Sequence, residues 1–307
     1  MPVRRPRVAV LLAAFNGMRW IEEQLTSILG QTAVDVDIHI SIDPSTDGTE
    51  AWCAAFADRH DTVSVLPAAG KFGGASRNFF RLIRDVDFES YDFIAFADQD
   101  DVWNDDKLQR AVHVIRARHV DGYSSNVTAF WSDGRTHLLD KAQPQVEWDF
   151  LFEAAGPGCT YVMGRHLVDS LKKSMLENWH ALQDVSLHDW YCYAYARSHD
   201  YRWFIDPEPS MKYRQHERNQ VGANKGLSPL IARYKTIHDG WWFNQVRLIA
   251  RLVEKGDHSF VRTWLQLRRI HLLRLSFSAW HCRRRMRDKL FFFGICWVTA
   301  LIGNKAR

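Results

Sequence analysis

The sequence is poor in cysteine and has no close cysteine pair. Its five cysteines are Cys53, Cys159, Cys192, Cys282 and Cys296, an odd number without a C-x-x-C motif. Disulfide frameworks and zinc sites use paired or clustered cysteines, so this pattern argues against both. It indicates buried free thiols in a reducing compartment, and we expect a cytoplasmic protein.

The sequence also lacks a long hydrophobic run. Val8–Ala14 follows a basic N-terminus but stops before Asn16-Gly17 and has no convincing cleavage site, so we interpret it as a strand rather than a signal peptide. Leu290–Ile302 is apolar but shorter than the roughly 20 residues that span a bilayer.

Excess charge of one sign is missing as well. The 307 residues have a formal charge of +4, with 46% hydrophobic and 25% charged residues. These values are ordinary for a soluble globular enzyme and argue against disorder. A chain of this length can bury a substantial core in one large domain or slightly more.

Strands and helices alternate through the first hundred residues. Apolar runs and alternation predict strands at Val8–Ala14, Val36–Ile42, Val63–Leu66 and Phe93–Ala97, and helical spacing predicts helices at Trp20–Leu29, Thr49–Arg59 and Ser76–Asp85. This order predicts an α/β fold with a mainly parallel sheet and right-handed crossovers. Ligands bind such sheets beyond the carboxyl ends of the strands, where the polar clusters of this sequence fall.

The strongest chemical signal is Asp98-Gln99-Asp100-Asp101, directly after a buried strand. Carboxylates two residues apart at a strand end can converge on Mg²⁺ or Mn²⁺, which would bind the diphosphate of a substrate. The alternative interpretation is that Asp100 or Asn104 caps a helix that begins near Asp105.

The second half of the sequence is less regular. A Gly156-Pro157-Gly158 turn precedes a predicted strand at Thr160–Met163, a helix from Arg165 and an aromatic helix over His188–Ala196. Beyond Gly226 the chain becomes basic, aromatic and helical. We therefore predict a catalytic domain at residues 1–225 and a helical C-terminal region at 226–307.

Five segments in register resemble family 2 glycosyltransferases of the GT-A fold. "SIDPSTDGT" is similar to the family's "DDGSTDGT" element, and "FADQDDVW" to its metal-binding strand end. "GPGCTYVMGR", "LHDWY" and "YRQHERNQVGA" resemble the rhamnosyltransferase-like branch that builds bacterial surface polysaccharides. The resemblance covers roughly residues 7–225.

The resemblance implies an inverting transfer of a sugar from a nucleotide carrier to a hydroxyl group. The implied donor is dTDP-L-rhamnose, or else a UDP-sugar, and the acceptor is a growing, lipid-linked surface polysaccharide. It also implies a divalent cation, either Mg²⁺ or Mn²⁺.

The resemblance assigns roles to individual donor-side residues. Asp43 would accept a hydrogen bond from N3–H of a pyrimidine base. The remaining nucleotide-sugar contacts implied in this way are Ala13, Phe15, Asn16, Arg77, Asp98 and Gln99. The implied metal ligands are Asp98, Asp100 and His216. An alternative for Arg77 is a surface salt bridge.

Asp189 matches the family's catalytic base, with Gly158 and Trp190 on the acceptor side. An inverting transfer needs one carboxylate to take the acceptor proton during attack on the anomeric carbon. Trp190, Tyr191 and Tyr193 are expected to wall a sugar site and raise the pKa of Asp189 by partial desolvation. The alternative is that Asp189 caps a helix that starts near Trp190.

The C-terminal region combines arginines with tryptophans and phenylalanines, which suits an anionic membrane surface. Peripheral docking at the inner face of the cell membrane is one interpretation. The alternative is a helical region that packs on the core or forms a homodimer. A basic surface confined to this tail argues against a nucleic-acid partner.

Two other functions fit the sequence less well. A nucleotidyltransferase usually carries a Gly-rich basic loop after its first strand, whereas Ala13–Met18 lacks one. A non-catalytic protein that binds a nucleotide-sugar or lipid carrier would be expected to have lost the base or the metal carboxylates, and both are present.

Overall fold

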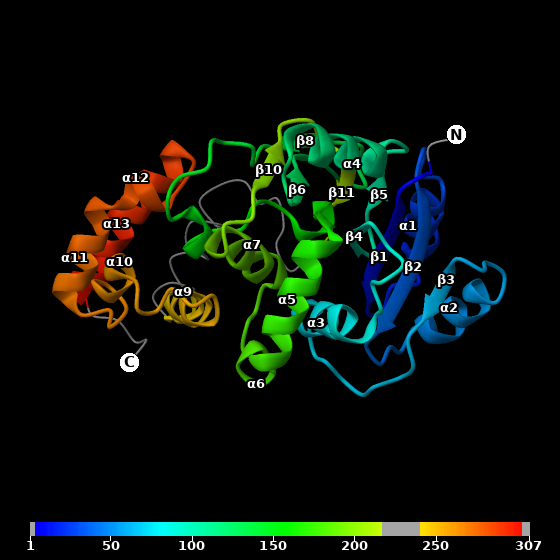
Figure 1. Cartoon of the computed structure of the whole chain (residues 1–307), viewed down its shortest axis with the longest axis horizontal. Coiled ribbons are helices and arrows are strands. Elements are labelled where there is room, and N and C mark those ends of the chain that lie inside the picture. The colour runs from blue at the N-terminus through cyan, green and yellow to red at the C-terminus, as the bar shows by residue number, and fades with distance from the viewer. Residues whose placement is uncertain (1–3, 217–239, 303–307) are drawn as a thin grey trace.

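The computed structural model describes residues 4–216 and 240–302. The predicted domain boundary at residues 225/226 lies outside the described residues. In Figure 1 the N-terminal strands lie at the right, and the C-terminal helices form the opposite end of the molecule.

A seven-stranded sheet forms the centre of the N-terminal part. Its strand order is β10-β6-β9-β4-β1-β2-β3, and β9 alone runs antiparallel to its neighbours. The strands are β1 (Arg7–Ala14), β2 (Asp35–Ile42), β3 (Val63–Val65), β4 (Phe93–Asp98), β6 (Gly122–Ser125), β9 (Val162–Gly164) and β10 (Trp203–Asp206). The predicted mainly parallel α/β fold is therefore confirmed.

Helices cover both faces of this sheet, which is why β1 and β4 are apolar along their length. The helices are α1 (Ile21–Leu29), α2 (Thr49–Ala57), α3 (Ala75–Asp85), α4 (Lys107–Arg118), α5 (Arg165–Glu177), α6 (Trp179–Leu182) and α7 (His188–Ser198). Successive strand residues point to opposite faces. Accordingly, Ala9 and Leu11 join the core with α3, α5 and α7, whereas Val8, Val10 and Leu12 join the core with α1 and α4.

A second sheet brings a distant segment to the end of β4. Its order is β5-β11-β7-β8, with β5 (Val102–Trp103), β7 (Val127–Phe130), β8 (Thr136–Leu139) and β11 (Met211–Arg214). β11 pairs antiparallel with β5 through Met211 and Trp103. The residues that follow β11 therefore reach the acidic end of β4.

The predicted strand at Thr160–Met163 begins later than expected. Gly158–Thr160 instead form the 3-10 turn η2, in which the Thr160 amide donates to the Pro157 carbonyl at 3.0 Å. The strand β9 then starts at Val162, while the predicted helix from Arg165 is confirmed as α5.

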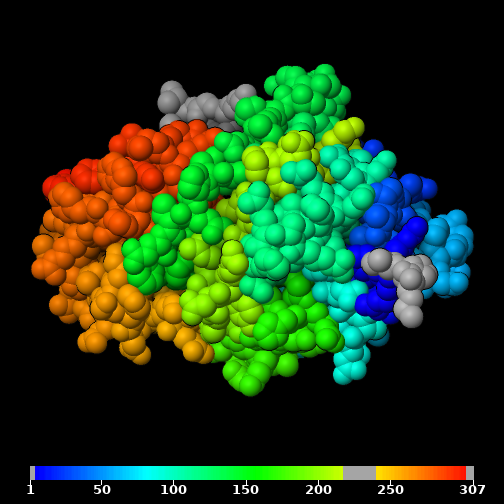
Figure 2. Space-filling view, turned by 45° about the horizontal axis from the view of Figure 1, so that its top comes forward, coloured from blue at the N-terminus to red at the C-terminus, as the bar shows by residue number. Residues whose placement is uncertain are grey.

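The C-terminal region is helical and packs on the N-terminal part of the chain. It comprises α9 (Trp241–Leu252), α10 (Ser259–Arg262), α11 (Arg269–Phe277), α12 (Ala279–Cys282) and α13 (Met286–Ile302). Phe243, Trp264 and Phe292 are buried in the same cluster as Phe152. Figure 2 shows these orange and red helices in contact with the green middle of the chain. Within residues 4–216 and 240–302, no helix has the length and apolarity needed to cross a membrane.

All five cysteines are free and buried, as the sequence predicts. Burial raises the pKa of each thiol, and that of Cys53 rises to about 12.

A buried ion-pair network joins the C-terminal region to the core. Asp149, in the 3-10 turn η1 (Asp149–Leu151), accepts from the Arg284 guanidinium at 3.0 Å and from Arg197 at 3.2 Å. The Tyr193 hydroxyl also donates to Asp149 at 2.9 Å. Burial raises the pKa of Asp149, and the charges of Arg284 and Arg197 oppose that rise.

Replacing Arg284 by methionine is expected to lower the free energy of unfolding by about 3 kcal/mol or more, because it leaves a buried carboxylate without its main partner. Denaturant unfolding measures this change. The control Arg287→Gln removes an arginine whose side chain is 68% exposed, and it should leave the midpoint unchanged. Equal midpoints for the two variants would contradict the proposed importance of the network.

Candidate active site

The candidate site lies where β1, β2 and β4 end. Ala13 pairs with Ser41 of β2 and with Asp98 of β4, so these three positions share one edge of the sheet. The loops that follow the strands supply the polar groups. This is the sheet edge at which open α/β folds bind ligands.

The loop after β1 is fastened to its neighbours by reciprocal hydrogen bonds. The Phe15 amide donates to Gln99 Oε1, and Gln99 Nε2 donates to the Phe15 carbonyl, both at 2.8 Å. Asn16 has a positive φ of 48°, and its Oδ1 accepts from the Thr46 amide at 2.8 Å. A Cβ at Gly17 would collide with the Gln99 side chain. Gln99 therefore holds the shape of the loop, while the Phe15 ring is 52% exposed.

Asp43 organises a second loop. Its carboxylate is buried and accepts from the Phe72 amide at 2.6 Å and from the Gly73 amide at 3.0 Å. A carboxylate oxygen has two lone pairs, so each oxygen keeps capacity for another donor.

Arg77, in the first turn of α3, hydrogen-bonds to backbone rather than to a carboxylate. Its Nε donates to the Gln183 carbonyl at 2.8 Å, and its Nη1 donates to the Phe72 carbonyl at 3.4 Å. Arg77 thus links the loop that Asp43 holds to the segment before α7. The alternative of a surface salt bridge finds no support among the ion pairs of the described residues.

Asp98, Asp100 and His216 are brought together at the end of β4. His216 Nε2 lies 2.6 Å from Asp100 Oδ2, although the two residues are 116 positions apart. The imidazole stacks on Trp20 with ring centroids 4.2 Å apart. Desolvation and the charges of Asp100 and Asp189 raise the pKa of Asp98 to about 7.

The helix-capping alternative for this segment is wrong. α4 begins at Lys107, and no side chain caps its first turn. Asp100 faces His216 instead, and the Asn104 amide group donates to the Pro209 carbonyl at 3.1 Å.

A buried group that the sequence analysis missed lies beneath the site. Asp101 Oδ1 accepts from the Arg214 amide at 3.0 Å, and Lys107 Nζ donates to the Cys159 carbonyl at 3.0 Å. The ammonium lies 3.3 Å from the centre of the Trp103 ring. Burial lowers the pKa of Lys107 to about 7, opposed by the charges of Asp101 and Asp98. The helical spacing of the sequence does not indicate that this lysine is buried.

Two sets of donors could hold a divalent cation. Asp98, Asp101 and Cys159 lie within 4.8 Å of one another, but burial raises the thiol pKa, so Cys159 is protonated and a poor ligand for a hard cation. The carboxylates of Asp98 and Asp100 with the His216 imidazole provide oxygen and nitrogen donors at the mouth of the site. This second set fits Mg²⁺ or Mn²⁺ better.

Asp189 lies in the first turn of α7, opposite the acidic end of β4. Its charge contributes to the raised pKa of Asp98, which places both carboxylates in one site. Burial raises the pKa of Asp189 itself to about 6. Its Oδ1 accepts from the Trp190 amide at 2.8 Å, and it faces Gly158. The capping alternative is wrong, because α7 begins at His188 with Leu187 as its N-cap and no side chain caps it.

The aromatic residues after Asp189 do not wall a sugar site. Trp190, Tyr191 and Tyr193 are at most 2% exposed, and the Trp190 indole donates to the Phe150 carbonyl at 2.9 Å. Their role is to fill the core beneath α7. This corrects the prediction that Trp190 faces the acceptor.

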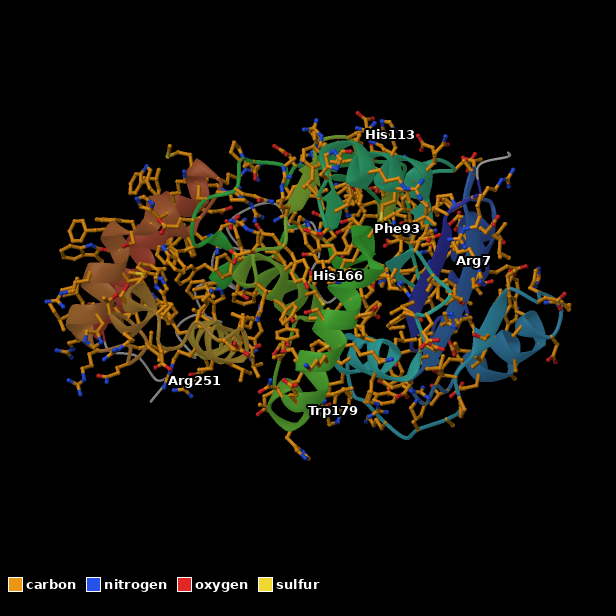
Figure 3. All side chains as sticks on the ribbon, viewed as in Figure 1. Arg7, Phe93, His113, His166, Trp179 and Arg251 are labelled. Atoms are coloured by element: carbon orange, nitrogen blue, oxygen red, sulfur yellow. The ribbon has the colours of Figure 1, made fainter. Side chains whose placement is uncertain are left out.

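Another groove of the described surface lies elsewhere, near the amino-terminal ends of the strands. It has a volume of about 700 Å³ and includes Arg7, Phe93 and His166. Figure 3 labels these residues, and Arg7 and Phe93 begin β1 and β4. This groove therefore does not include the acidic site.

This mainly parallel sheet, with polar loops at its carboxyl edge, has the GT-A fold of glycosyltransferases. The chain belongs to glycosyl transferase family 2, whose family model matches residues 9–159. It is 45% identical over 281 residues to the dTDP-rhamnosyl transferase RfbG of Shigella flexneri, an alignment that covers 91% of this chain and 96% of that protein.

Solved structures show the same fold at low sequence identity. Residues 1–349 of S. aureus TarS in complex with UDP align with a TM-score of 0.54 and 12% identity, covering 98% of this chain and 93% of that one. The Pyrobaculum calidifontis mannosyltransferase PcManGT, in complex with GDP-Man and Mn²⁺, aligns with a TM-score of 0.51 and 16% identity. That match covers 98% of this chain and 88% of PcManGT.

Replacing Gly158 by alanine is expected to slow turnover about a hundredfold, since small displacements of reacting groups have effects of this size. The new Cβ would lie 2.9 Å from both Asp189 Cβ and His188 Nε2, so Asp189 must move. Steady-state kinetics measure the loss. The control Gly164→Ala meets only the Asp121 carbonyl at 3.6 Å and should keep the parental rate. A Gly158→Ala enzyme with parental kcat would contradict this role.

Proposed function

We propose that this enzyme transfers L-rhamnose from dTDP-rhamnose, with inversion, to a hydroxyl of a lipid-linked surface polysaccharide in the cytoplasm. The observation that carries the proposal is a desolvated carboxylate, Asp189, across from the acidic end of β4. The 45% identity to a dTDP-rhamnosyl transferase supports the choice of donor. The second candidate donor is a UDP-sugar, since TarS binds UDP on the same fold.

The donor nucleotide would lie against the loops that follow β1 and β2. Ala13, Phe15 and Asn16 present backbone and one exposed ring, and Asp43 would accept from N3–H of thymine or uracil. Arg77 holds the loop at Phe72, so its effect on the nucleotide would be indirect.

Asp98, Asp100 and His216 would hold Mg²⁺ or Mn²⁺ beside the donor diphosphate. When bound, the cation would neutralise negative charge on the departing nucleotide diphosphate. The Asp100–His216 contact of 2.6 Å and the Trp20 ring on the imidazole keep these ligands close before any cation binds.

Asp189 would act as the general base. The acceptor oxygen forms a bond to the anomeric carbon as the bond from that carbon to the diphosphate oxygen breaks. The proton of the acceptor hydroxyl passes to the Asp189 carboxylate, and dTDP leaves with the electron pair. Attack opposite the leaving group inverts the anomeric centre.

We assign residues 1–225 to the catalytic domain and 226–307 to a helical region that completes it. The shared cluster of Phe152 with Phe243, Trp264 and Phe292 supports one folding unit with two functional parts. The main rival remains a non-catalytic protein that binds a nucleotide-sugar or lipid carrier on the same scaffold.

The first experiment is nucleotide release from a panel of dTDP- and UDP-sugars, with Mg²⁺, with Mn²⁺ or with EDTA. We expect slow hydrolysis of dTDP-rhamnose that requires the cation. Asp100→Ala should lower this rate at least about a hundredfold by removing a metal ligand. The control Asp105→Ala removes an exposed carboxylate nearby and should have no effect. Donor binding without turnover under all these conditions, and also with a lipid-linked acceptor, would favour the rival.

The pH dependence tests the base. A general base works when it is ionised, so a carboxyl pKa of about 6 predicts that kcat/KM is constant above that pH and falls about tenfold per unit below it. Asp189→Asn should lower the rate by roughly 10²- to 10⁴-fold and remove the inflection near pH 6. The control Asp184→Asn changes an exposed carboxylate just before α7. Unchanged turnover in Asp189→Asn would exclude Asp189 as the base.

A further inference from the structure

The C-terminal helices have an exposed apolar face that the catalytic mechanism does not use. In α13, residues 286, 290, 293, 297 and 301 recur at intervals of three and four and therefore share one side of the helix. The large apolar side chains exposed on α13 are Met286 (57%), Leu290 (57%), Trp297 (38%) and Leu301 (72%).

α11 and the following turn extend this face. The Phe277 ring is 69% exposed and contacts Phe293 of α13 with ring centroids 5.9 Å apart. Ile270 lies two turns before Phe277 on the same side of α11 and is 52% exposed, and Trp280 of α12 is 44% exposed. We name this surface the outer face, defined as Ile270, Phe277, Trp280, Met286, Leu290, Phe293, Trp297 and Leu301.

Positive charge borders the outer face. Arg274 is exposed and lies between Ile270 and Phe277 on the same side of α11. Residues 260–302 contain one acidic residue, Asp288, and nine basic ones: Arg262, Arg268, Arg269, Arg274, Arg283, Arg284, Arg285, Arg287 and Lys289. Arg283 and Arg284 bond inward to the core, which leaves basic side chains around the apolar surface.

These features favour one occupant, an anionic lipid bilayer. Aromatic and aliphatic side chains with arginine and lysine beside them suit the boundary between headgroups and acyl chains. A second copy of the chain fits less well, because joining two outer faces would bring Arg274 and its basic neighbours against the same charges.

We propose that the outer face docks this protein on an anionic phospholipid membrane, with α11 and α13 lying along the surface. Figure 1 shows α11 and α13 side by side at the end of the molecule opposite β3. In this orientation the N-terminal strands of the central sheet would lie at the end of the molecule away from the lipid.

Docking would bring the acceptor side of the active site to a defined position. Arg283 donates to the Phe152 carbonyl at 2.8 Å, and Arg284 donates to the Ala154 carbonyl at 2.6 Å. These carbonyls precede Gly158, which contacts Asp189. Hydrogen bonds thus connect the segment before α13 to the loop beside the base. That this arrangement presents a lipid-linked acceptor rests on the proposed function.

The test is co-sedimentation of the full-length protein with sucrose-loaded vesicles. One set contains phosphatidylcholine alone, and the other contains phosphatidylcholine and phosphatidylglycerol in equal parts. We expect binding to the anionic set only, weakened by added salt. Arg274→Gln should lower the partition coefficient about fivefold, and Phe277→Ser with Leu290→Ser about tenfold or more.

Matched controls are available on other surfaces. Leu176→Ser changes a leucine of α5 that is 51% exposed, and Arg5→Gln removes an exposed arginine near β1. Both controls should bind vesicles like the parent. All variants should keep parental far-UV circular dichroism and parental donor hydrolysis in solution, since the outer face lies away from the acidic site.

Three outcomes would overturn the proposal: no binding to anionic vesicles, equal binding to neutral ones, or binding that the outer-face variants leave unchanged. A dimer seen by light scattering that the same variants dissociate, without vesicle binding, would assign the face to a second copy. Vesicle binding without hydrolysis of any donor would leave the docking intact and count against the proposed function alone.

Discussion

Asp98, Asp100 and Asp101 repel one another across a partly desolvated edge of the sheet, and the charge of Asp189 adds to the repulsion at Asp98. Most of the local structure can be understood as a response to this repulsion. Lys107 lies under the cluster, and β11 delivers the Arg214 amide to Asp101 and His216 to Asp100. The second sheet is small, but it has an electrostatic role. It brings donors from a segment more than a hundred residues away to charges that β4 would otherwise leave uncompensated.

The same principle recurs at a second place, where Asp149 lies buried between arginines from α7 and from the segment before α13. Buried ion pairs add little net stability, but any arrangement that leaves one partner without the other is strongly destabilised. The network therefore fixes where the C-terminal helices sit relative to the loop that approaches Asp189. Apolar packing around Phe152 holds the C-terminal helices against the core, and the ion pairs fix their position on it.

The sequence predicts the central sheet well because β1 and β4 are buried on both faces and carry uninterrupted apolar runs. The acidic end of β4 is visible for the same reason, since aspartates after such a run need an explanation. Contacts between distant segments are invisible in the sequence, and these include the stacking of His216 on Trp20 and the burial of Lys107 against Trp103. The prediction that the aromatic residues of α7 line a sugar site was wrong for a further reason. A helix that is buried on almost every side has no polar face, so its composition does not distinguish aromatic residues of the core from those that line a ligand site.

The five buried thiols have a practical consequence for studying the enzyme. Thiol reagents attack the thiolate, and burial raises the pKa of every cysteine in this chain. A cysteine introduced on the surface would consequently be the reactive one, without removal of the native residues. Spin labels or fluorophores can then be attached singly, which opens distance measurements between the helical end of the molecule and its nucleotide loops.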